Sequence, residues 1–108
     1  MPYMPEPTAE PSKEEVEKMP GLVLLEFGAT WCPHCQAAQS MLKAELGKRA
    51  NVKHLKIEDG RGRPLGRNYR VKLWPNLVFL RDGQVLSQLA RPSDAELQET
   101  FKQFDATE

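Results

Sequence analysis

The chain has 108 residues, of which 40% are hydrophobic and 28% are charged. This length suits one domain with a single hydrophobic core. Fifteen basic residues balance fifteen acidic ones, so the net charge gives no reason to expect nucleic acid or a membrane surface as a partner. No apolar stretch approaches the length needed to span a bilayer.

The N-terminal segment predicts a flexible proline-rich arm over residues 1–11, followed by one domain over residues 12–108. Four prolines fall within the arm, together with little that could pack. The arm has neither the basic start nor the apolar stretch of a signal peptide. We therefore expect a cytoplasmic protein from the chain as it stands, and a periplasmic one if a leader has been trimmed.

The first half of the domain predicts a helix, a strand and a longer helix. Ser12-Lys13-Glu14-Glu15 is a capping box that should start a short helix ending near Pro20-Gly21. The nearly continuous apolar run Leu22–Phe27 is typical of a central strand covered on both faces. A helix over about 33–49 follows, and its apolar face contains Ala38, Met41, Leu42 and Leu46.

The second half predicts three more strands and a final helix. Residues 52–57 form an edge strand, and one or two helical turns fall within 61–70. Residues 76–80 and 85–90 flank Asp82-Gly83, a hairpin turn signal. A capping box at 93–96 starts the last helix, whose buried stripe is Leu97, Phe101 and Phe104. The order α-β-α-β-α-β-β-α predicts a sheet with helices on both faces.

Cys32 and Cys35 are the only cysteines, and they lie together in Trp31-Cys32-Pro33-His34-Cys35. This segment follows the apolar strand and opens the long helix. Two thiols this close, at a strand-to-helix turn, can alternate between dithiol and disulfide. The context therefore predicts redox chemistry.

A structural disulfide and a metal site are the two other interpretations of the cysteine pair. A disulfide that closes so short a loop stabilises the fold by only about 2 kcal/mol, so a purely structural role is less favoured. Structural zinc needs four ligands, and only His34 and His54 could supplement the thiols. His34 lies inside the motif itself and is poorly placed to join the same zinc site, and an iron–sulfur cluster would need cysteines from a second chain. We expect no bound metal and no cofactor, with a metal-linked dimer through the cysteines as the weaker alternative.

From about Val16 to Phe104 the chain resembles thioredoxins. The resemblance depends on the apolar strand that leads into the Cys32–Cys35 motif, and on Trp74-Pro75 placed before the hairpin. It implies an α/β, thioredoxin-like fold with a central mixed four-stranded sheet of order 2-1-3-4, flanked by helices on both faces. The proline-rich arm takes the place of the extra N-terminal strand of full thioredoxins.

The two cysteines should have different roles. Cys32 lies where the helix begins, near unpaired N–H groups and the positive end of the helix dipole. Cysteines in such settings have pKa values of roughly 3.5 to 7.5, a range drawn partly from thioredoxin-like proteins. Cys32 is therefore predicted to be the nucleophile and Cys35 the resolving thiol, acting through a mixed disulfide.

Pro33 and His34 are predicted to tune the redox potential. Proline is suited to a first helical turn, and a protonated His34 would favour the Cys32 thiolate. The pair looks like that of DsbA, the bacterial periplasmic oxidant, although the large helical insertion of that family is missing. A solvated histidine with no electrostatic role is the alternative for His34.

Glu26 interrupts the apolar strand and is predicted to be a buried acid. Burial disfavours the charged form, so its pKa should be raised. The resemblance places there an acid that exchanges protons with the resolving cysteine, although a strand-end glutamate that reaches solvent is the alternative. His54 falls about where thioredoxins often carry a lysine, and we expect it to be a plain surface histidine.

Three residues are predicted to bind substrate. Pro75 resembles the cis-proline that faces the active-site cysteines in thioredoxins, with an ordinary trans proline as the alternative. In that family the preceding residue, here Trp74, hydrogen-bonds an extended substrate strand. Trp31 matches the loop before the nucleophile and is expected to line the groove.

The predicted function is thiol–disulfide exchange with protein substrates. The expected partners are protein dithiols and disulfides, and a reductase or other thiol electron donor. We expect a monomer that binds neither nucleic acid nor membrane. The rival function is a thioredoxin-fold binding module with little catalytic turnover.

Overall fold

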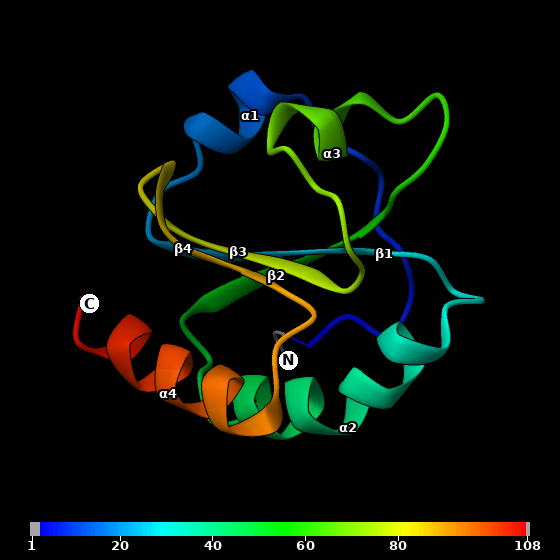
Figure 1. Cartoon of the computed structure of the whole chain (residues 1–108). Coiled ribbons are helices and arrows are strands. Elements are labelled where there is room, and N and C mark those ends of the chain that lie inside the picture. The colour runs from blue at the N-terminus through cyan, green and yellow to red at the C-terminus, as the bar shows by residue number, and fades with distance from the viewer. Residues whose placement is uncertain (1–2, 108) are drawn as a thin grey trace.

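The computed structural model describes residues 3–107 (Figure 1). It confirms the predicted order of helices and strands. In chain order the elements are α1 (Lys13–Glu17), β1 (Leu22–Gly28), α2 (Pro33–Gly47), β2 (Val52–Glu58), α3 (Pro64–Asn68), β3 (Asn76–Arg81), β4 (Gln84–Ala90) and α4 (Asp94–Asp105).

The four strands form one mixed sheet of order β2-β1-β3-β4, as predicted. β1 runs parallel to β2, with Glu26 opposite Lys56, and antiparallel to β3. β3 and β4 form the antiparallel hairpin. Every residue of β1 is buried, because it has a neighbour on each side and helices over both faces (Figure 1).

Alternation along β1 divides its side chains between two hydrophobic clusters. Val23, Leu25 and Phe27 pack with α1 and α3, whereas Leu22 and Leu24 pack with α2 and α4. Successive side chains of a strand point to opposite faces. Glu26 therefore faces α2, the helix that contains Cys35 and is capped by Cys32.

Local capping explains where the helices begin and end. Both hydrogen bonds of the Ser12 capping box are present, and Ser93 Oγ accepts from the Glu96 N–H at 3.1 Å. α1 ends at Glu17, earlier than predicted. The Lys18 N–H donates to the Glu15 carbonyl three residues back, at 3.2 Å, and such bonds tighten and close a final turn.

The arm makes more contacts than its composition suggests. The Thr8 N–H donates to the Lys56 carbonyl on the outer edge of β2, at 2.7 Å. The Tyr3 ring stacks on His54, and a Glu10 oxygen accepts from the Leu65 N–H at 3.1 Å. The division into arm and domain, and the flexibility of the arm, stay predictions. Over residues 3–107, none of the helices has the length and apolar character to cross a membrane.

Candidate active site

Cys32 is the N-cap of α2. Its backbone is extended and its Sγ accepts a hydrogen bond from the Cys35 N–H at 3.2 Å. The sulfur thus occupies the place of a capping oxygen, next to N–H groups that lack helical partners. Pro33 fills the first turn of the helix, where its missing N–H is tolerated. Both cysteines are free thiols and are buried.

Cys35 is held in the protonated form. Burial, followed by its hydrogen bond with Cys32, raises the pKa of the Cys35 thiol to about 12. At neutral pH this thiol can attack only if a base removes its proton.

Gly28 allows the Cys35 sulfur to approach β1. A Cβ on Gly28 would lie 2.6 Å from Cys35 Sγ, well inside van der Waals contact. The sequence did not single out Gly28 for this role. The feature that could have indicated it is a glycine at the end of the strand that leads into the cysteine motif.

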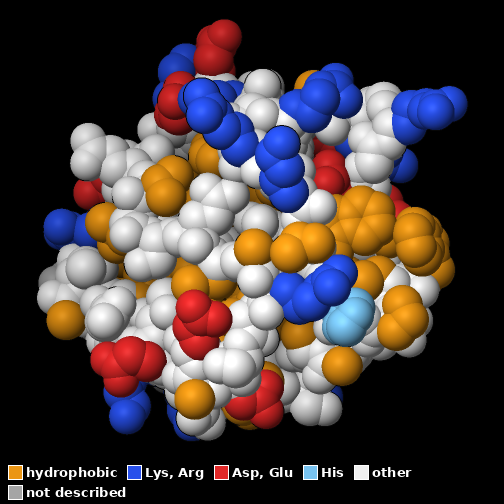
Figure 2. All heavy atoms as spheres, in the orientation of Figure 1, with side chains coloured by type: hydrophobic (Ala, Val, Ile, Leu, Met, Phe, Trp, Pro, Cys, Tyr) orange, Lys and Arg blue, Asp and Glu red, His pale blue; other side chains and the backbone are white. Residues whose placement is uncertain are grey.

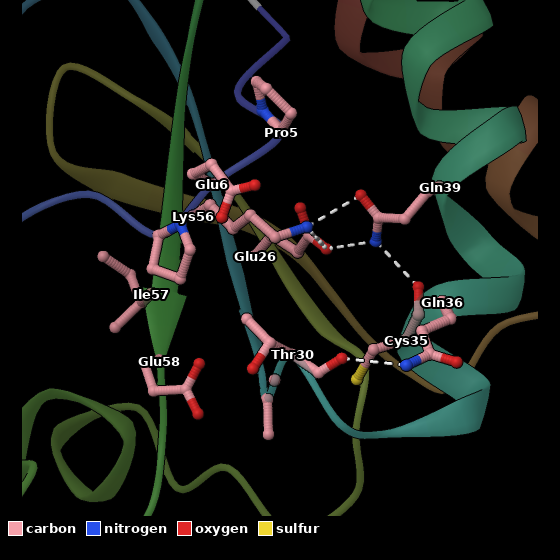
Figure 3. Close-up of a pocket in the computed structure, with 13 residues that line it drawn as sticks. Pro5, Glu6, Glu26, Thr30, Cys35, Gln36, Gln39, Lys56, Ile57 and Glu58 are labelled. Atoms are coloured by element: carbon pink, nitrogen blue, oxygen red, sulfur yellow. Dashed lines mark hydrogen bonds and ion pairs between the residues drawn. The ribbon is translucent and has the colours of Figure 1, made fainter.

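Glu26 is buried, as predicted, and receives three hydrogen bonds. His54 Nε2 lies 2.8 Å from its Oε1. Gln39 Nε2 and Lys56 Nζ donate to its Oε2 at 2.8 and 3.3 Å. Figure 3 shows the carboxylate between Gln39 on α2 and Lys56 on β2.

The predicted rise in the pKa of Glu26 is wrong. Burial is the largest single influence and raises the pKa. The His54 hydrogen bond, the Lys56 charge, the Gln39 hydrogen bond and positive charge at His54 together outweigh it, so the pKa of Glu26 lies below its ordinary value. Donors and positive charge favour the carboxylate form. Glu26 is therefore ionised at neutral pH.

The prediction of a surface position for His54 is also wrong. Its side chain is 0% exposed, and the Met4 N–H donates to its Nδ1 at 2.8 Å. The alternation of β2 could have indicated this position. Val52 packs against α2 and α4, so residues 54 and 56 face the same side of the sheet, toward Glu26.

Gln39 is a functional candidate that the sequence analysis missed. Its Nε2 donates to Glu26 and also to the Cys35 carbonyl, at 2.7 Å. Its Oε1 accepts from Lys56 Nζ and from the Tyr3 hydroxyl, both at 2.7 Å. One amide side chain thus connects the acid, the cysteine backbone and the arm. A lone glutamine on a helix gives no sequence signal for this role.

A cavity of about 230 Å³ connects Glu26 with Cys35 (Figure 3). Its walls include Pro5 and Glu6 from the arm, Cys35 from α2 and Lys56 from β2. A water molecule occupies roughly 30 Å³ in the liquid, so a polar cavity of this size has room for several. Such a cavity can carry protons between the acid and the thiol.

On the other side of the cysteines, the Trp74–Pro75 peptide bond is cis, as predicted. The Trp74 ring packs against Ala29, Cys32 and Cys35, and its Nε1 donates to Asp59 Oδ2 at 2.9 Å. Asp59 was not singled out from the sequence. It fixes the orientation of the indole beside the sulfurs.

The surface around the cysteines is apolar at its centre. Trp31 is 69% exposed and meets Trp74 edge-on, with ring centroids 5.5 Å apart. His34 is exposed in the first turn of α2. Figure 2 shows hydrophobic side chains gathered on this face around a histidine and a Lys or Arg side chain, with further Lys and Arg side chains above them. The substrate-binding roles of Trp31, Trp74 and Pro75 stay predictions.

No group of three or more His, Cys, Asp or Glu side chains within residues 3–107 is arranged to hold a metal ion.

Sequence comparison gives matches over nearly the whole chain. The Thioredoxin family model matches residues 5–103. The chain is 30% identical to thioredoxin H-type of Ricinus communis over 104 residues, which cover 93% of this chain and 87% of that protein. It is 33% identical to thioredoxin-1 of Drosophila melanogaster over 78 residues, or 70% of this chain and 72% of that protein.

Structural comparison agrees. Thioredoxin 2 of Pseudomonas aeruginosa PAO1 in its reduced form superposes with a TM-score of 0.84 at 44% identity, over 97% of this chain and all of that one. The thioredoxin Deadhead of Drosophila melanogaster gives a TM-score of 0.71 at 28% identity, over 83% of this chain and 85% of that one. Since the matched region contains both cysteines and the cis-proline, the chain belongs to the thioredoxin family and is a thiol–disulfide oxidoreductase.

Proposed function

We propose that the protein exchanges disulfides with protein substrates, with Cys32 as the nucleophile and Cys35 as the resolving thiol. One observation carries this assignment: the Cys32 sulfur caps α2 and accepts the Cys35 N–H. Donors around a sulfur favour its thiolate, which is the attacking form. Cys35 has the opposite property, because burial holds its pKa at about 12.

The reaction has two transfers. The Cys32 thiolate attacks a substrate disulfide, forms a mixed disulfide and releases one substrate thiolate. Cys35 then loses its proton and attacks Cys32 Sγ, which releases the second substrate thiol and leaves a disulfide in the protein. A dithiol donor, either a reductase or another thiol protein, supplies the two electrons that regenerate the cysteines.

Glu26 is the proposed acceptor of the Cys35 proton. It shares a cavity with Cys35 and is ionised because of its three donors. A carboxylate that is already charged can take the proton without a preceding step.

Reduction of insulin by dithiothreitol tests the function. The protein should accelerate precipitation of the insulin chains well above the rate with dithiothreitol alone, because the cysteine pair relays electrons to the insulin disulfides. The double variant Cys32→Ser/Cys35→Ser is the control and should return the rate to background.

The rival functions give different results. A binding module without turnover would leave the insulin rate at background in the parent protein too. A metal-linked dimer would contain stoichiometric metal when purified under reducing conditions, so metal analysis with gel filtration identifies it.

His34→Pro should lower the reduction potential, by about 30 mV for every 1.4 kcal/mol of thiolate stabilisation that is lost. A histidine that stabilises the thiolate favours the reduced protein, so its removal makes the disulfide relatively more stable. Equilibration with a glutathione series measures the potential. His34→Ala is the matched control for proline's backbone effect and should shift the potential in the same direction. An unchanged or raised potential in both would remove His34 from the redox argument.

A further inference from the structure

The arm touches the buried acid network at a point that the proposed reaction does not use. Tyr3 stacks on the His54 ring, with centroids 5.6 Å apart and planes 26° apart. The Tyr3 hydroxyl donates to Gln39 Oε1 at 2.7 Å. The Met4 N–H donates to His54 Nδ1 at 2.8 Å. The arm thus binds one nitrogen of the ring, while Glu26 binds the other.

These contacts select one form of the His54 ring. A nitrogen that accepts a hydrogen bond carries no proton, so the proton of a neutral imidazole must be on the other nitrogen. That nitrogen is Nε2, which lies 2.8 Å from Glu26 Oε1. A proton on Nδ1 would face the Met4 N–H, and the resulting cation would be fully buried. The arm therefore favours the neutral ring with Nε2–H directed at Glu26.

We propose that residues 3–8 act as a positioning strap, which opposes a proton on His54 Nδ1 and thereby helps Glu26 to accept the Cys35 proton at mildly acidic pH. The strap is anchored at its far end by the Thr8 N–H on the Lys56 carbonyl. The part of this proposal that concerns catalysis rests on the proposed role of Glu26. Tyr3, Met4 and His54 are positioning residues, since they act through Glu26.

Loss of the strap should make the site sensitive to acid. The titratable groups that face His54 and Glu26 are Lys56 from β2, Cys35 from α2, and Tyr3 and Glu6 from the arm, with Glu58 also lining the cavity. Histidine is the side chain that ordinarily titrates near pH 6.5. An unstrapped His54 can take a proton on Nδ1, and the new positive charge beside Glu26 would weaken its proton affinity.

A matched pair of substitutions isolates the Met4 N–H. Met4→Pro removes this donor, whereas Met4→Ala keeps it and changes only the side chain. The ring-nitrogen NMR shifts of His54 are followed in the full-length reduced protein between about pH 5.5 and 8. In the parent and in Met4→Ala, Nδ1 should stay unprotonated to a lower pH than in Met4→Pro. In Met4→Pro it should gain a proton as the pH falls, with exposed His34 as the internal reference for a solvated ring.

The second readout is the rate of resolution of a preformed mixed disulfide on Cys32. The two variants should resolve the mixed disulfide at equal rates near pH 8. Near pH 5.5 the resolution rate of Met4→Pro should be lower by about threefold or more. One added positive charge lowers a neighbouring carboxyl pKa by about one unit or more, and a weaker base transfers the proton more slowly. A second pair of variants covers the case in which Met4→Pro perturbs folding. Tyr3→Ala removes the ring that stacks on His54 and should give His54 spectra like those of Met4→Pro. Tyr3→Phe keeps that ring and should give His54 spectra like those of the parent.

The outcomes are distinct. Identical ring spectra in Met4→Pro and Met4→Ala at every pH would overturn the strap. Altered spectra with equal resolution rates at all pH values would overturn its catalytic role. Failure of the proposed function shows elsewhere, as an unchanged resolution rate in Glu26→Gln, and the ring spectra do not depend on turnover.

Discussion

Replacing Cys32 with serine is expected to reduce insulin turnover to the rate of dithiothreitol alone, whereas Cys35→Ser is expected to trap substrates as mixed disulfides. Both cysteine residues are almost equally inaccessible to solvent, so exposure alone does not distinguish them. Hydrogen bonding does, because Cys32 Sγ accepts the Cys35 N–H at the start of α2 and the helix terminus favours negative charge. Only Cys32 is then poised to attack, and only Cys35 can release the product.

Trapping and alkylation measure this assignment separately. Cys35→Ser, incubated with a protein disulfide, should give a covalent adduct that dithiothreitol releases, and Cys32→Ser should give none. Limited alkylation of the reduced parent at mildly acidic pH, followed by peptide mass analysis, should label Cys32 first. Labelling of Cys35 before Cys32 would contradict the assignment.

Glu26→Gln is expected to slow resolution by about 100-fold or more, within the range of 10² to 10⁴ that a general base contributes, while the first attack by Cys32 is unchanged. Burial, followed by the hydrogen bond with Cys32, raises the pKa of the Cys35 thiol to about 12, so this thiol is protonated at pH 7 and needs a base before it can attack. Glutamine keeps the shape of glutamate but cannot accept the proton. Stopped-flow measurement of the two steps provides the test, and equal resolution rates near neutral pH would leave Glu26 a structural residue.

The pH dependence of folding is the control for that variant. The folded-state pKa of Glu26 is lowered from an ordinary value of 4.5. Its contribution to stability is therefore complete above that value and is lost as the pH falls through the folded-state pKa. Unfolding in urea between about pH 3 and 7 should show less acid loss in Glu26→Gln than in the parent, because glutamine does not titrate.

The local sequence determined the elements that depend on near neighbours. The apolar run Leu22–Phe27 predicted the central strand, since a strand that is buried on both faces does not need to alternate polar and apolar side chains. The capping residues Ser12 and Ser93 marked the starts of two helices. The Cys32–Cys35 spacing put both thiols in one helical turn, and that geometry requires no distant residue.

Tertiary structure alone decided the charge state of the acid and the place of its partners. Burial of Glu26 followed from its strand, but its pKa depends on His54, 28 residues away, and on Gln39, 13 residues away. Met4 reaches His54 across 50 residues. A buried carboxyl has a raised or lowered pKa according to the balance between desolvation and its donors. The apolar strand revealed the desolvation, and only the packing of α2, β2 and the arm supplied the donors.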